Sequence, residues 1–150
     1  RVYDLYWSAI NTGYTDYVSA AITLQKGSCR LVAGEHHSMG ELMQPGMLRK
    51  AQNWTLTLSG HAERVGMIAL FWNYAEPNVY KDEEALRLPV QSGEDFDIEL
   101  VVNGDAGKAQ LKNKGELIEE LTFTPSHHKG LYLILQDAEI ILNHIKVVKN

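Results

Sequence analysis

The chain has 150 residues and a formal net charge of −5 at pH 7, with 45% hydrophobic and 22% charged residues. These values are typical of one soluble domain built around one core. The 14 Lys and Arg residues are scattered rather than gathered in a stripe, which argues against nucleic acid or an anionic membrane surface as a partner. No apolar run is long enough to span a bilayer.

The chain begins with Arg1 and shows no signal-peptide pattern. We therefore expect residues 1–150 to be a single β-sandwich domain excised from a larger protein. Cys29 is the single cysteine, so an internal disulfide is excluded. Its alternation with Leu31 predicts a small buried side chain rather than a reactive thiol.

Short β-strands and turns are predicted along the first third of the chain. An aromatic, irregular opening favours an edge strand or a loop, and Lys26-Gly27 supplies a turn. In chain order we expect an edge strand or loop over 1–15, strands over 17–24 and 28–34, a polar loop over 35–40, and a bulged or edge strand over 41–48.

Residues 53–73 carry two apolar runs joined by a polar link at 60–64. In the first run Trp54 and Leu58 alternate with polar residues, which indicates a half-buried strand. The second run, 67–72, is apolar on both faces, and we expect the two runs to form a hairpin. One face of the second run can pack on the core, so the other must be covered by another element or bind something.

The second half continues as strands with turn signals between them. We expect a long loop over 74–84, strands over 85–90 and 94–102, turns at 92–93 and 103–108, a strand or loop over 109–115, and strands over 116–123, 130–136 and 139–148. Helical turns over 85–91 or 116–121 are the alternative, and a bulge is expected in 116–123. Strands at this spacing predict an all-β protein, an antiparallel β-sandwich.

Five stretches carry a further pattern: the strand NWTLTLSGHA at 53–62, the preceding GELMQPGML at 40–48, and the closing LTFTP, GLYLIL and 137–147 segments. Together they resemble jelly-roll carbohydrate-binding modules, the galactose-binding-domain-like β-sandwiches. The resemblance implies a jelly roll and a non-catalytic module that binds polysaccharide or glycan. It implies a glycoside hydrolase or a phage tail spike as the parent protein, and hence an extracellular or virion-associated location.

Sugar recognition combines aromatic rings against apolar sugar faces with charged or amide groups against hydroxyls. For Trp72, and still more for Trp54, packing in the core is the preferred interpretation, whereas aromatics in loops are harder to explain by packing. We predict no catalytic residue and the following ligand-binding candidates: Trp7, Arg30, Phe71, Trp72, Tyr74, Tyr80, Asp97, Glu99 and Tyr132.

No cofactor is predicted. The resembled modules often hold calcium between their terminal strands, for which Asp4 and Asp137 are the candidates, but no calcium-loop motif occurs. The histidine pairs at 36–37 and 127–128 lack the spacing of a zinc site and are expected in solvated loops.

Two other functions stay open. The first is a structural, assembly or receptor-binding module of a multimeric fibre or tail-spike protein. Such a module would pack the surplus face of the second run against a neighbouring chain, giving a homo-oligomer. A polysaccharide hydrolase would use Asp97 and Glu99, which lie about 7 Å apart along one strand face. Alternating carboxylates on a surface strand are usually solvated, so binding is the preferred hypothesis.

Overall fold

The computed structural model describes the backbone of residues 2–3, 8–9, 17–19, 21–25, 28–32, 37–43, 52–73, 84–125 and 131–150, and the side chains of the last three ranges. The strands in these ranges are β1 (Val2–Tyr3), β2 (Ser8–Ala9), β3 (Tyr17–Ser19), β4 (Ala21–Gln25), β5 (Ser28–Val32), β6 (His37–Met43), β7 (Asn53–Arg64), β8 (Gly66–Phe71), β9 (Leu86–Val90), β10 (Asp95–Asn103), β11 (Lys108–Asn113), β12 (Glu116–Thr122), β13 (Leu131–Gln136) and β14 (Glu139–Lys149).

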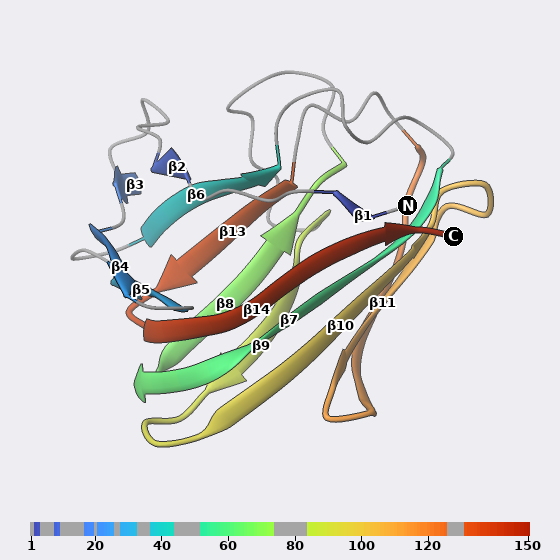
Figure 1. The fold of residues 1–150 in the computed structure, drawn as a ribbon. Helices are drawn as coiled ribbons and strands as arrows, with labels where there is room; N and C mark the ends of the chain where they lie inside the picture. The colour runs from blue at the N-terminus through green and yellow to red at the C-terminus, as the bar shows by residue number, and fades with distance from the viewer. Residues whose placement is uncertain are drawn as a thin grey trace.

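The strands form two sheets that face each other as a sandwich (Figure 1). The larger sheet has the order β12-β11-β10-β7-β14-β5-β4, with β1 also paired to β14. The smaller sheet has the order β2-β6-β13-β8-β9, with β3 paired to β6. The β3–β6 pair is parallel and the other pairs are antiparallel. The prediction of an all-β antiparallel sandwich of the jelly-roll type is confirmed.

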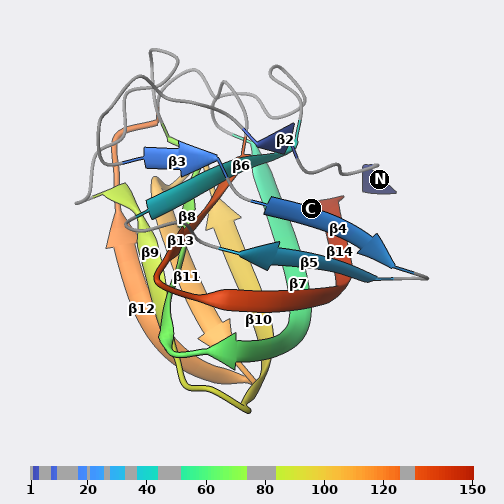
Figure 2. The same ribbon diagram turned by 90° about the vertical axis from the view of Figure 1, so that its left-hand side faces the viewer.

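Strand β14 organises the larger sheet because three strands pair with it. Its whole length pairs with β7, its first residues pair with β5, and its last residues pair with β1. The β1 register joins Val2 to Val148, so the two ends of the described chain lie at the same edge (Figures 1 and 2).

The core lies between the sheets and follows the alternation of the sequence. On β7 the side chains of Trp54, Leu56 and Leu58 are buried, while the residues between them are partly exposed. Strand β10 repeats the pattern from Phe96 to Val102. Because successive strand residues point to opposite faces, these runs give each strand one buried and one solvated face. The strand predicted over 94–102 is confirmed.

The predicted hairpin between the two central runs is wrong. β7 belongs to the larger sheet and β8 to the smaller one, so the runs face each other across the core instead of pairing. The alternation continues through the expected link, where Gly60 and Ala62 are buried and the polar residues between them point outward. The strand therefore runs on to Arg64, and the chain crosses between the sheets at Val65.

Two tryptophans meet where these runs oppose each other. The ring centroids of Trp54 and Trp72 lie 5.9 Å apart with an interplanar angle of 89°, and Trp72 makes a similar contact with Phe123 at 5.8 Å. Edge-to-face geometry places the positive edge of one ring against the negative face of the next. The row of three rings links the two sheets at this end of the core.

The second face of β8 is also covered. Ala69 and Phe71 form a separate buried cluster with Ala85, Tyr132 and Ile134, and Phe71 is only 2% exposed. Both faces of the strand are therefore packed within a single chain. This explains why the run is apolar throughout, as in strands buried on two sides.

Of the other local predictions, some are confirmed and one is wrong. Strands occur over both segments for which helical turns were the alternative. The expected bulge is present, because the register shifts after Leu111 and leaves Ile118 without a partner on β11. The polar loop expected over 35–40 is wrong from residue 37 onward, since β6 begins at His37.

Candidate functional site

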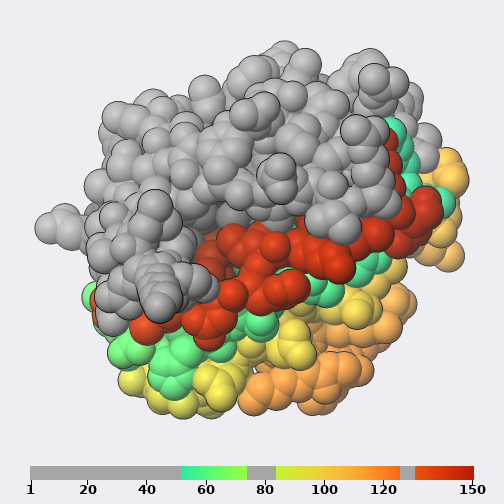
Figure 3. All heavy atoms as spheres, viewed as in Figure 1, coloured from blue at the N-terminus to red at the C-terminus, as the bar shows by residue number. Residues whose placement is uncertain are grey.

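The outer face of the larger sheet carries the polar residues that alternate with the core. Figure 3 shows β14, β7, β10 and β11 side by side on this face. The strand registers align their outward residues in rows across the sheet. One row places Lys146, Thr57, Glu99 and Lys112 next to one another on four adjacent strands.

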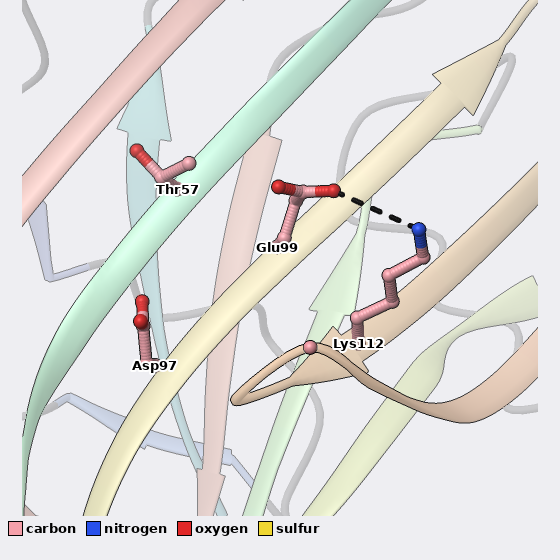
Figure 4. Close-up of a pocket in the computed structure, with 5 residues that line it drawn as sticks. Thr57, Asp97, Glu99 and Lys112 are labelled. Atoms are coloured by element: carbon pink, nitrogen blue, oxygen red, sulfur yellow. Dashed lines mark ion pairs between the residues drawn. The ribbon is translucent and has the colours of Figure 1, made fainter.

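A depression of about 310 Å³ lies on this face, lined by Thr57, Asp97, Glu99, Lys112 and Gly115. Thr57 comes from β7, Asp97 and Glu99 from β10, and Lys112 from β11 (Figure 4). Gly115 belongs to the two-residue turn that joins β11 to β12. The depression therefore has a floor of three rigid strands and one wall made by a turn.

The β11–β12 turn is fixed to the backbone of Asp97. The Asp97 N–H donates to Asn113 Oδ1 at 2.9 Å, and the Lys114 N–H donates to the Asp97 carbonyl at 2.9 Å. Lys114 and Gly115 have φ angles of 52° and 81°, the positive values that a tight hairpin of this kind requires. Both backbone polar groups of Asp97 are thus satisfied by residues 113 and 114, which fixes the backbone from which the carboxylate projects.

Glu99 and Lys112 are direct cross-strand partners. Their closest charged atoms, Oε1 and Nζ, are 4.0 Å apart, and their side chains are 46% and 35% exposed. A solvated pair of this kind contributes about 0.2–1 kcal/mol, so a ligand can draw on either group at little cost. In the part of the chain whose side chains are described, the Asp97 carboxylate has no hydrogen-bond partner.

Two histidines lie on the same outer face. His144 on β14 and Thr57 share a hydrogen bond of 3.0 Å between Nε2 and Oγ1, which extends the polar surface beyond the depression. Farther along β7, His61 Nδ1 is 2.8 Å from Asp95 Oδ1. Within the described side chains, no three His, Cys, Asp or Glu residues gather in a way that could hold a metal ion.

Three of the predicted aromatic candidates are buried. Trp72 is 0% exposed and lies in the main core, which matches the packing role weighed for it. Phe71 is 2% and Tyr132 7% exposed in the second cluster. A ring must offer a face to the ligand in order to stack on a sugar, so these three side chains provide no binding surface here.

The same holds for the other aromatic residues with described side chains. Trp54, Phe96 and Phe123 are all at most 8% exposed. Over 52–73, 84–125 and 131–150 the polar outer face therefore carries no Phe, Trp or Tyr side chain, and it offers hydrogen-bonding groups instead.

Four candidates fall outside the described side chains. Trp7, Tyr74 and Tyr80 lie outside the described residues altogether. For Arg30 the backbone alone is described, and it pairs with Ile141 on β14. The predictions for these four residues stay predictions, as does that for the terminal calcium candidate Asp4.

The two carboxylates that the sequence indicated do come together in the depression. Thr57, Lys112 and Gly115 were missed. Thr57 alternates with Trp54 and Leu56 in the sequence, so the outward direction of its side chain could be predicted. The strand that lies next to it could not be predicted. Lys112 becomes a neighbour of Glu99 only through the β10–β11 register.

Comparison with known proteins places the fold among carbohydrate-recognition structures. The carbohydrate recognition domain of Emp47p superposes with a TM-score of 0.62 at 9% identity, over 96% of this chain and 88% of that one. The carbohydrate-binding module CBM66 from Bacillus subtilis gives 0.60 at 8% identity, over 93% and 92%. A sialidase gives 0.61 at 9% identity, over 86% of this chain but 16% of its own length.

No family model matches the sequence, and no curated protein matches it. At these identities the structural likeness defines the fold. The chain has the jelly-roll sandwich that carbohydrate recognition domains and binding modules have. Among its described residues, no helix is long and apolar enough to cross a membrane.

Proposed function

We propose that this domain is a non-catalytic carbohydrate-binding module and that its glycan lies in the depression around Asp97 and Glu99. The observation that carries the proposal is the meeting of four polar side chains over a floor of three strands, on a fold shared with carbohydrate recognition domains. Carboxylates accept hydrogen bonds from sugar hydroxyls, and the Lys112 ammonium donates to them. Rigid strands hold these groups with little loss of conformational freedom on binding.

Binding without hydrolysis is supported by the surroundings of the two carboxylates. A glycosidase needs one carboxylic acid that stays protonated, which proteins achieve by placing it in an apolar pocket. Asp97 is exposed and Glu99 is 46% exposed on an open polar face. Neither side chain has the apolar surroundings of such an acid, and both suit hydrogen bonding to hydroxyls.

The hypothesis of an assembly module depended on an exposed apolar face of the second run. The second face of β8 is already buried in the cluster around Phe71, so it offers no exposed apolar patch to a neighbouring chain. We accordingly propose that the isolated domain is a monomer at micromolar concentration, which sedimentation velocity would test. An extracellular or virion-associated location remains part of the proposal, since that is where such modules meet glycans.

A glycan array followed by calorimetry tests whether the domain binds a glycan and whether the depression is the binding site. The wild-type domain is expected to bind at least one glycan class, and the double variant Asp97→Asn, Glu99→Gln to bind it at least about tenfold more weakly. The matched control is Glu94→Gln, which removes an exposed carboxylate from the β9–β10 turn. Folding is checked by the thermal midpoint of each variant. An array without hits would overturn the function, and equal affinities for all variants would overturn the site.

A further inference from the structure

The charges around the depression are balanced. Asp97 and Glu99 supply two negative charges to its lining, and Lys112 supplies one positive charge. Lys146 adds a second positive charge, because it lies in the same cross-strand row as Thr57. The lining and this row thus present two acidic and two basic groups, which are Asp97, Glu99, Lys112 and Lys146.

Balanced charges at this spacing cancel at a short distance from the sheet. The depression therefore creates no net field that would attract an anionic or a cationic ligand. The carboxylate of a uronic acid would be attracted by Lys112 but repelled by Asp97 and Glu99, and the ammonium group of an amino sugar would meet the reverse. Either charge would lose hydration without a net opposite field to compensate the loss, whereas an uncharged sugar has no such cost.

The Glu99–Lys112 pair adds a geometric requirement. At 4.0 Å the two charged atoms are too far apart for a hydrogen bond to each other, so their hydrogen-bonding capacity is open to a third group. The carboxylate only accepts and the ammonium only donates. Two neighbouring sugar hydroxyls satisfy both, one donating to Glu99 and the other accepting from Lys112.

Asp97 provides a second acceptor along the same strand. It lies two residues before Glu99 on β10, which corresponds to about 7 Å along the strand. Both side chains rise over the depression with Thr57 beside them on β7 (Figure 4). This spacing lets Asp97 accept a hydrogen bond from a hydroxyl on the far side of the same ring or from the next ring.

We propose that the depression selects an uncharged sugar through a pair of neighbouring hydroxyls, which bridge Glu99 and Lys112 while Asp97 accepts from a third. This inference rests on the proposed function and names its ligand class. The site then discriminates against uronic acids and amino sugars, because their charges lose hydration without a net opposite field. It also discriminates against deoxy sugars, because a missing hydroxyl leaves one of the paired groups without its partner.

Calorimetry with matched probes tests the ligand class. The probes are neutral gluco-, galacto- and manno-hexasaccharides, oligogalacturonate of the same length, and deacetylated chito-oligosaccharide, each titrated at low and at high salt. At least one neutral series is expected to bind at least about tenfold more tightly than either charged series. Its affinity is expected to change less than about twofold between the two salt concentrations, because no net charge is neutralised.

Substitutions of Glu99 and Lys112 test whether this pair binds the neutral sugar. Glu99→Gln and Lys112→Met are each expected to weaken neutral-sugar binding by about tenfold. The control Lys108→Met removes a lysine from the same strand and face, two rows away, and should leave the affinity unchanged. Tighter, salt-sensitive binding of a charged glycan would overturn this inference and leave the proposed function standing. Failure of every glycan to bind would overturn the proposed function itself.

Discussion

The carboxylate of Glu119 on β12 accepts a hydrogen bond of 2.9 Å from the backbone N–H of Arg87 on β9. These two strands are the facing edges of the larger and smaller sheets, so the bond closes one side of the sandwich. Pro89 lies two residues along β9, where the backbone points the same way, and it has no N–H. Both positions are thereby made unavailable for pairing with another strand.

Removing the Glu119 carboxylate should destabilise the domain. Glu119→Ala leaves the part-buried Arg87 N–H without this acceptor, which should cost about 1–3 kcal/mol in the free energy of unfolding. Urea denaturation followed by circular dichroism measures the change. Glu120→Ala is the control on the same strand, because Glu120 is exposed and bonds to Gln110 on the surface, and it should cost less than about 0.5 kcal/mol. Equal losses for the two variants would contradict the role of the bond.

Gly60 is required where β7 passes β14. A Cβ at this position would collide with the carbonyl oxygen of Ile141 and lie 2.9 Å from Cζ of Phe96. Gly60→Ala should therefore destabilise the domain by about 1–3 kcal/mol, because the collision with the carbonyl requires the β14 backbone to move. Ser59→Ala, one residue earlier on the outward face, is the control and should be nearly neutral. Thermal unfolding of both variants measures the loss of stability. An unchanged midpoint for Gly60→Ala would contradict the prediction, because it would show that the β14 backbone moves at little cost.

Asn113 positions Asp97 without touching a ligand in the proposed mode. Asn113→Ala removes the acceptor of the Asp97 N–H and should weaken glycan binding by about fivefold. The same substitution in an Asp97→Asn background should have no further effect, because the carboxylate it positions is already gone. Asn103→Ala is the control, since Asn103 makes a comparable side-chain bond to Ala106 N–H in a different turn. Additive effects in this double-mutant cycle would contradict a positioning role.

Tryptophan fluorescence should separate buried from ligand-sensitive rings. Trp54 and Trp72 are both 0% exposed, so neither should respond to acrylamide or to a sugar on the outer sheet face. In the Trp7→Phe variant, fluorescence should be blue-shifted, resistant to acrylamide and unchanged by a bound glycan. Strong acrylamide quenching in that variant would contradict the burial of the two core tryptophans.

The candidate site was predictable in part. Alternation alone placed Asp97 and Glu99 on one solvated face, because neighbouring residues on a strand point to opposite sides. Alternation could not identify Lys112 as the neighbour of Glu99, since that contact depends on how two strands align. The choice of aromatic residues as ligand-binding candidates was based on residue type alone. Phe71 and Tyr132 are apolar enough for either role, and the second cluster buries them.

The sequence by itself determined which residues of most strands share a face, because period-2 alternation is a local property of the chain. It placed Trp54 and Leu58 on one face of their strand, and the spacing of the strands indicated an antiparallel β-sandwich, to which the resemblance added the jelly-roll form. Only the tertiary structure decided which strands are partners. β7 and β8 follow each other in sequence, yet they lie in opposite sheets, since strand pairing is a contact between distant segments. The depression exists only in that arrangement, because its lining comes from three strands and a turn.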